Sequence, residues 1–114
     1  MAVQIKRVYD EPEPGDGYRV LIDRLWPRGL SKERASVDLW CKQVAPSTEL
    51  RTWFGHRRER FAEFSRRYLQ ELDDNPALDV LRQVLADHPT VTLVYGAKDR
   101  EANDAVVLAQ LLDS

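Results

Sequence analysis

Positively charged side chains follow two apolar runs of the sequence, at the points where each run gives way to a turn. Arg24 and Arg28 come after the run at residues 20–22, and Lys98 comes after the run at residues 90–95. Guanidinium groups form paired hydrogen bonds to carboxylates and phosphates, and an ammonium contributes a point charge. If the two runs are neighbouring parallel strands, the three cations meet beyond their carboxyl ends, where open α/β sheets bind ligands. This pattern predicts an anion-binding site.

Four further side chains are candidates for the same site. Arg51 adds a cation, and His56 is the candidate general acid or base because imidazole titrates near neutral pH. Asp99 is a catalytic candidate that would orient the ligand, and Asn103 is a candidate ligand contact. Together these residue types support electrostatic stabilisation of an anionic group. They identify no particular bond to be broken.

Structural roles stay open for the two arginines. Arg24 and Arg28 could instead form ion pairs with Asp23 or Asp38 and stack on Trp26. Both roles use the same planar set of donors, so the residue types alone do not separate them.

Lys98 and His56 also have ordinary structural explanations. A lysine just before a predicted helix opposes the helix dipole by roughly 0.3–1 kcal/mol, and a bound anion would relieve that penalty. Alternatively, Lys98 pairs with Asp99 or Glu101, and Asp99 caps the helix. His56 could be an exposed residue at a helix end, where its charge favours the negative end of the dipole.

Several other kinds of site are not indicated. The two histidines and the single cysteine are widely spaced, so no metal ligand is assigned. The sequence has neither a P-loop nor a G-x-G-x-x-G fingerprint, and no cofactor is predicted. Arginines between residues 57 and 67 alternate with glutamates, which favours a solvated face over a nucleic-acid surface.

The composition is that of one small globular domain, residues 1–114. Hydrophobic residues make up 43% of the chain and charged residues 32%, so a core and a solvated surface are both expected. The net charge of −2 makes nucleic acid an unlikely partner. Cys41 is the single cysteine, and no apolar leader or membrane-length run is present. These features predict a cytoplasmic protein with no membrane partner and leave its oligomeric state open.

Periodicity predicts three strands, at residues 3–9, 18–24 and 90–95. Helices are expected after a cap at Ser47 or Thr48, ending at Gly55, and at residues 59–72, 77–86 and 102–112. Residues 30–47 are expected to form a loop and a short helix. This order predicts a small α/β fold with a mainly parallel sheet flanked by helices in a Rossmann-like three-layer arrangement, with α+β as the alternative.

The combination of motifs resembles a known family. The segments KRVYD, DGYRVLIDRLWPRG, WFGH and VTLVYGAKD are similar to those of the YeaO-like branch of the bacterial DUF488 group, over nearly the whole chain. The resemblance implies a small cytoplasmic α/β protein with no established activity. Its motif positions include Trp26 and Tyr95, which join the candidate ligand contacts.

One departure from the family pattern bears on function. Family members often have Asn-His-Ala in the last motif, whereas this chain has Asn103-Asp104-Ala105. If that histidine were a metal ligand or an essential base, this chain should lack the function. The departure therefore argues against a histidine-based metal site.

Three functions are compatible with the sequence. The first is a pocket for a phosphate- or carboxylate-bearing small molecule, in an enzyme or an enzyme-like protein. The second is a non-catalytic ligand- or protein-binding module, with Trp26, Trp40 and Trp53 as interface anchors. The third is nucleic-acid binding through the arginine-rich helix, which the acidic net charge disfavours.

Overall fold

Four parallel strands form one sheet in the computed structural model, which describes residues 2–113. The strands are β1 (Ala2–Arg7), β2 (Tyr18–Leu21), β3 (Leu39–Trp40) and β4 (Thr90–Tyr95), and their order is β1-β4-β2-β3. β4 is therefore central, with β1 and β2 as its parallel neighbours. The predicted α/β fold with a parallel sheet is confirmed.

The strand predictions differ from the structure in three ways. β1 covers Ala2–Arg7 rather than residues 3–9, because the chain turns at residues 8 and 9. β2 ends at Leu21 rather than at residue 24, although the Ile22 amide still donates to the Val94 carbonyl at 3.3 Å. β3 was not predicted, because two residues are too short to show a period of two. It pairs with Val20 and Leu21 at the edge of the sheet.

Five α-helices accompany the sheet among the described residues. They are α1 (Lys32–Ala35), α2 (Thr48–Phe54), α3 (Phe61–Asp73), α4 (Ala77–Asp87) and α5 (Asp104–Leu112). Ser47 caps α2 by accepting from the Leu50 amide, as predicted, and Gly55 ends it in the left-handed region at φ 53°. Three short 3-10 turns lie at Pro14–Asp16, Lys42–Val44 and Arg58–Arg60.

Two of the predicted helix starts are wrong. α3 begins at Phe61 instead of residue 59, because residues 58–60 form a 3-10 turn. α5 begins at Asp104 instead of residue 102, because the Asn103 side chain accepts from the Val106 amide and caps the helix there. Ala102 is buried, but it belongs to the preceding loop.

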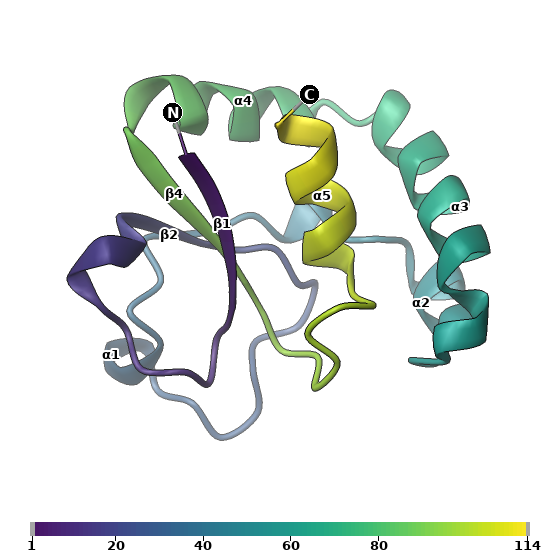
Figure 1. The fold of residues 1–114 in the computed structure, drawn as a ribbon, viewed down its shortest axis with the longest axis horizontal. Coiled ribbons are helices and arrows are strands. Elements are labelled where there is room, and N and C mark those ends of the chain that lie inside the picture. The colour runs from purple at the N-terminus through teal and green to yellow at the C-terminus, as the bar shows by residue number, and fades with distance from the viewer. Residues whose placement is uncertain (1, 114) are drawn as a thin grey trace.

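The two faces of the sheet are covered unequally. One face carries the main core, formed with α2, α3, α4 and α5, and includes the fully buried Phe64, Tyr68 and Leu108. α5 contacts β1 and β4, and α3 lies beyond it against α2 and α5 (Figure 1). A smaller cluster on the other face joins Leu21 and Val94 to Ala35 of α1. The sheet is thus the middle of three layers, as predicted, and the layer that contains α1 on its second face is the smaller one.

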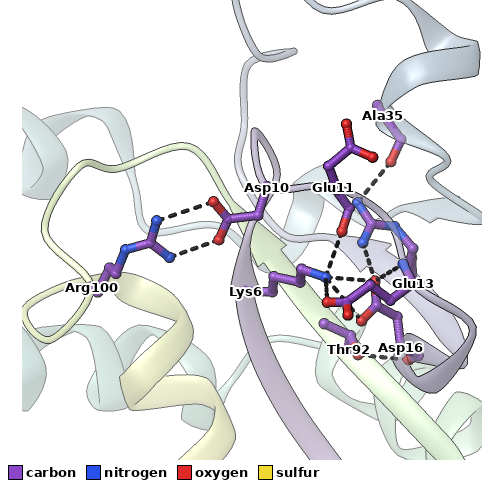
Figure 2. Close-up of polar contacts among 9 residues, drawn as sticks. Lys6, Asp10, Glu11, Glu13, Asp16, Ala35, Thr92 and Arg100 are labelled. Atoms are coloured by element: carbon purple, nitrogen blue, oxygen red, sulfur yellow. Dashed lines mark hydrogen bonds and ion pairs between the residues drawn. The ribbon is translucent and has the colours of Figure 1, made fainter.

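A network of buried charges fixes the loop between β1 and β2. The Asp16 carboxylate accepts from Arg19 Nη1 at 2.6 Å and from Lys6 Nζ at 3.2 Å, and Asp16 and Arg19 are only 5% and 3% exposed. The Thr92 hydroxyl of β4 donates to the Asp16 carbonyl at 2.6 Å (Figure 2). These bonds tie the loop to the central strand, at the opposite end of the sheet from the pocket described next.

Candidate functional site

A cavity of about 900 Å³ opens at the carboxyl ends of β2 and β4. Its walls are the segment after β2 (residues 23–25), the segment after β4 (residues 96–99), α2 and the first residues of α5. β2 and β4 are parallel neighbours, so the segments that follow them lie at one edge of the sheet. We call this cavity the strand-end pocket.

Six of the nine candidate residues line the strand-end pocket, and three do not. The six that line it are Arg24, Arg51, His56, Lys98, Asp99 and Asn103. The three that do not are Trp26, Arg28 and Tyr95.

Arg24 brings an unsatisfied donor to the pocket. Its Nε is fully buried and has no hydrogen-bond partner among residues 2–113. Its Nη2 makes only long contacts, 3.4 Å to the Ala45 carbonyl and 3.5 Å to the Pro46 carbonyl. A buried N–H without an acceptor costs about 1–3 kcal/mol, so the protein leaves part of the hydrogen-bonding capacity of Arg24 unused.

Arg51 and Lys98 are exposed side chains with unused donors. Within the described part of the chain, neither forms a hydrogen bond or an ion pair closer than 4.0 Å. The alternative pairing of Lys98 with Asp99 or Glu101 is not observed, because Arg58 bridges both of those carboxylates. Neither cation is therefore held in an ion pair, although Arg51 acts on the Asp23 carboxylate from a greater distance.

Asp99 is already committed to structural contacts. Its carboxylate accepts from Arg58 at 2.6 and 2.9 Å, and it also accepts from the Glu101 and Ala102 amides. The Arg58 guanidinium, followed by these backbone N–H groups, holds the pKa of Asp99 far below its usual range. The carboxylate stays ionised and lines the pocket as one half of an ion pair.

Asn103 is also occupied, as the cap of α5. It is 2% exposed, and its side chain accepts from the Val106 amide at 3.0 Å and donates to the Asp99 carbonyl at 2.9 Å. Because α5 starts after Asn103, Lys98 does not stand directly at a helix start, and the dipole argument for it is wrong. Asp99 caps only the turn before the helix.

His56 has an unusual backbone conformation. Its φ is 59°, in the left-handed region that non-glycine residues seldom adopt, and it follows Gly55, whose φ is also positive. The imidazole is exposed, lies 6.2 Å from the Phe54 ring and lines the pocket. Strain of this kind is common at binding sites.

A pair of carboxyl groups at the pocket wall was not among the sequence candidates. The side chains of Asp23 and Asp104 lie within hydrogen-bonding range of each other, and Asp23 Oδ2 also accepts from the Gly96 amide at 2.7 Å. Burial, and then the neighbouring Asp23 carboxylate, raise the pKa of Asp104 well above its usual value, and burial also raises the pKa of Asp23. Both shifts disfavour the state in which the two groups are ionised at once.

The sequence does contain one signal for the Asp23–Asp104 pair, which is the departure from the family pattern at residue 104. Asp104 stands where the resemblance leads one to expect a histidine, and that position turns out to face the pocket. Its partner Asp23 comes from the segment after β2. The pairing depends on β2 lying beside β4, which the sequence does not specify.

The other three candidates lie outside the pocket. Trp26 Nε1 donates to the Leu30 carbonyl at 2.7 Å, and its ring packs edge-on against Trp40 with centroids 5.4 Å apart. Arg28 is exposed, and its carbonyl accepts from the Tyr9 hydroxyl, while its side chain forms no hydrogen bond or ion pair among residues 2–113. Tyr95 is 2% exposed within the core.

The alternative roles of the two arginines are not observed either. In the described part of the chain, neither Arg24 nor Arg28 forms an ion pair with Asp23 or Asp38. Asp38 instead accepts from the Arg19 amide at 2.8 Å. Trp26 is therefore held by the Leu30 carbonyl and by Trp40 rather than by arginines.

The arginine-rich segment is largely neutralised by its surroundings. Arg66 and Arg67 both bind Glu63, Arg58 binds Asp99, and Arg60 donates to the Trp53 carbonyl. Such pairing is typical of a solvated face.

No group of three or more histidine, cysteine or acidic side chains in residues 2–113 is arranged to hold a metal ion. None of the helices described has the length and apolar character that crossing a bilayer requires.

Comparison with known proteins finds relatives of this chain over nearly its full length. A family profile described as the inactive DUF488-N3 subclade matches residues 2–114. The chain is 49% identical to the uncharacterized protein Rv3073c of Mycobacterium tuberculosis, covering 97% of this chain and 93% of that protein. It is 44% identical to the uncharacterized protein YeaO of Escherichia coli, covering 100% of this chain and 99% of that protein. No solved structure gives a significant match. The chain therefore belongs to the DUF488 family, within the subclade described as inactive DUF488-N3.

Proposed function

We propose that this protein binds a small phosphate- or carboxylate-bearing molecule in the strand-end pocket, without turning it over. The observation that carries the proposal is the Arg24 guanidinium, which lines the pocket with a buried Nε that lacks an acceptor in residues 2–113. A small turn of the Arg24 side chain toward the pocket would let an anionic oxygen accept from the donor that the protein itself leaves unpaired.

The charge of the pocket supports an anionic ligand. Arg24, Arg51 and Lys98 are permanent cations on its walls. Burial raises the pKa of both Asp23 and Asp104, which opposes the presence of two full negative charges on this wall. Asp99 is offset by Arg58. The walls keep an excess of positive charge even though the whole chain is acidic.

Two observations favour binding over catalysis. The subclade to which the chain belongs is described as inactive. The candidate acid or base, His56, forms no hydrogen bond with any described carboxylate that would orient its ring, whereas catalytic imidazoles are usually positioned by such a partner. His56 is therefore assigned here to the wall of the pocket.

The alternatives are less well supported. Trp26, Trp40 and Trp53 are all partly buried, and Trp53 lies under the Arg67 guanidinium at 4.4 Å, so they make poor anchors for a partner protein.

A cytoplasmic location remains our prediction, and a reducing compartment suits the free, buried thiol of Cys41.

The proposal is tested by measuring the binding of inorganic phosphate and acetate by calorimetry. Arg24→Ala, Arg51→Ala and Lys98→Ala should each weaken binding about tenfold or more, as expected for the loss of a charge-assisted contact. Arg82→Ala on α4 is the matched control, since Arg82 is exposed and lies outside the pocket. Arg28→Ala should behave like this control. If neither anion binds the native chain, or if the three pocket variants bind as tightly as the two control variants, the proposal is wrong.

A further inference from the structure

The acidic pair in a cationic pocket points to a ligand that carries charges of both signs. Asp23 and Asp104 lie side by side in a pocket whose other walls hold Arg24, Arg51 and Lys98. A site for a simple anion would not benefit from two carboxyl groups. Resting on the proposed function, we infer that the ligand is a zwitterion whose ammonium group binds the Asp23–Asp104 pair while its phosphate or carboxylate binds the cations.

The position of each carboxyl group is fixed by the fold. Asp23 Oδ2 accepts from the Gly96 amide at 2.7 Å, which ties the segment after β2 to the end of β4. Asp104 is the first residue of α5, and backbone N–H groups at the helix start also contact its carboxylate. Two separate elements therefore hold the carboxyls against each other, and the pair is preorganised before any ligand arrives.

The pair lacks the counter-charge that such groups normally have. In the described chain, neither Asp23 nor Asp104 forms an ion pair within 4.0 Å, although Arg51 and His56 act on Asp23 from a greater distance. Other acidic residues with restricted exposure do have partners, such as Asp16 with Arg19 and Lys6. An ammonium between the two carboxyls would supply the missing charge and two charge-assisted hydrogen bonds.

A second, independent observation points to a ligand in the same cavity. The buried Nε of Arg24 has no acceptor among residues 2–113, and Arg24 follows Asp23 directly in the sequence. One short segment thus brings to one cavity a guanidinium with an unused donor and a carboxylate that has no ion-pair partner within 4.0 Å among residues 2–113. A molecule with an anionic end and an ammonium end supplies a charged partner for each.

Binding should also lower the proton occupancy of the pair, whose pKa values are raised by burial. An ammonium next to both carboxyls stabilises their ionised forms, so protons bound to the pair pass to the buffer. No covalent bond is formed or broken. Proton release therefore distinguishes a ligand that reaches the pair from an anion that binds only the cations.

The test compares two matched pairs of probes on the native chain at pH 7. Ethyl phosphate and phosphoethanolamine differ only by the amino group, and so do propionate and β-alanine. For at least one pair, the amino compound should bind about tenfold more tightly, the gain expected from a charge-assisted contact. Calorimetry in two buffers of different ionisation enthalpy should show additional proton release for the amino compound, because the anionic group is the same within a pair.

The variant Asp104→Asn removes the second charge and keeps the size of the side chain. In this variant, the amino compound and its amine-free counterpart should bind with nearly equal affinity, for the probe pair in which the native chain prefers the amino compound. The additional proton release should disappear. The amine-free probe should bind at least as tightly as it binds the native chain. Circular dichroism verifies that the variant is folded, and Asp23→Asn provides a second variant if it is not. Equal affinities within both pairs on the native chain, or an unchanged ratio in the variants, would overturn the inference and leave the proposed function standing. If none of the four probes binds, the proposed function fails and the inference with it.

Discussion

The Asp23 carboxylate accepts a hydrogen bond of 2.7 Å from the Gly96 amide, and this bond joins the ends of two neighbouring parallel strands. A side chain at residue 96 would crowd this contact, since a Cβ there would lie 3.2 Å from Asp23 Oδ2. The bond holds Asp23 against Asp104 at the start of α5. Two carboxyl groups are thus kept together in a place where burial opposes their ionisation, and this has a consequence for stability.

Asp104→Asn should change how the stability of the protein depends on pH. The raised pKa of the native pair means that the folded state binds more protons than the unfolded state above the ordinary aspartate pKa of about 4. The free energy of unfolding of the native chain therefore falls as the pH rises through the pKa of the folded pair. The variant cannot form two carboxylates. Its free energy of unfolding should therefore rise relative to that of the native chain from pH 4 to pH 8.

This dependence is measured by urea denaturation at several pH values. The groups facing the pair are Arg51, His56 and the buried Tyr68 hydroxyl, and they are unchanged in the variant. Once Asp104 is ionised in the native chain, its negative charge stabilises the start of α5. The variant lacks this charge, which lowers its free energy of unfolding by about 0.3–1 kcal/mol. A difference in stability that stays constant between pH 4 and pH 8 would show that the pKa of the pair is not raised.

The sequence predicts the sheet and the main helices because those elements have strong periodic patterns. β4 is buried along residues 91–95, and Thr92 is the one polar residue among those five. α3 buries Phe64, Tyr68 and Leu72 on one stripe. β3 and the start of α5 could not be predicted, because a two-residue strand has no period and the stripe of α5 continues backwards to the buried Ala102.

The location of the pocket could be predicted, but not all of its residues. The rule that ligands bind beyond the carboxyl ends of parallel strands is sufficient to place Arg24 and Lys98 at one edge. It does not say which way the chain turns after Arg24. Residues 26 and 30 pack on the opposite face of the sheet, with Trp40, and this takes Arg28 away from the pocket.

Arg19→Met should destabilise the protein by about 3 kcal/mol, because it removes one partner of a buried ion pair. Arg19 is 3% exposed and donates to Asp16, to the Ser36 carbonyl and to the Ala35 carbonyl. Arg66→Met is the control, since Arg66 forms a similar pair with Glu63 on the exposed surface. The urea midpoint of the control should move little. If the two variants lose stability equally, the buried network is not a major support of the fold.

Gly17→Ala should destabilise the protein by about 2–4 kcal/mol, from left-handed strain together with overpacking. Gly17 has a φ of 65°, and a Cβ there would lie 2.3 Å from the Thr90 carbonyl oxygen. Gly15→Ala is the matched control two residues earlier, where a Cβ would meet nothing within 4 Å. Thermal unfolding of the two variants compares them directly. A native-like midpoint for Gly17→Ala would mean that the loop does not approach β4 this closely.

Asn103→Ala should cost about 1–2 kcal/mol of stability, because it removes the cap of α5 and the bond to the Asp99 carbonyl. It should also weaken phosphate binding, since α5 forms part of the pocket wall. Asn103→Ser restores an oxygen that can accept from the Val106 amide, so it should recover much of the stability measured by urea denaturation.

The serine variant also separates two roles for Asn103. The structure uses both polar atoms of the amide internally and leaves the residue 2% exposed, so its effect on a ligand should be indirect. Stability and phosphate affinity should therefore recover together in Asn103→Ser, because both depend on where α5 begins. If stability recovers and affinity does not, Asn103 contacts the ligand itself, as its place in the sequence motif suggests.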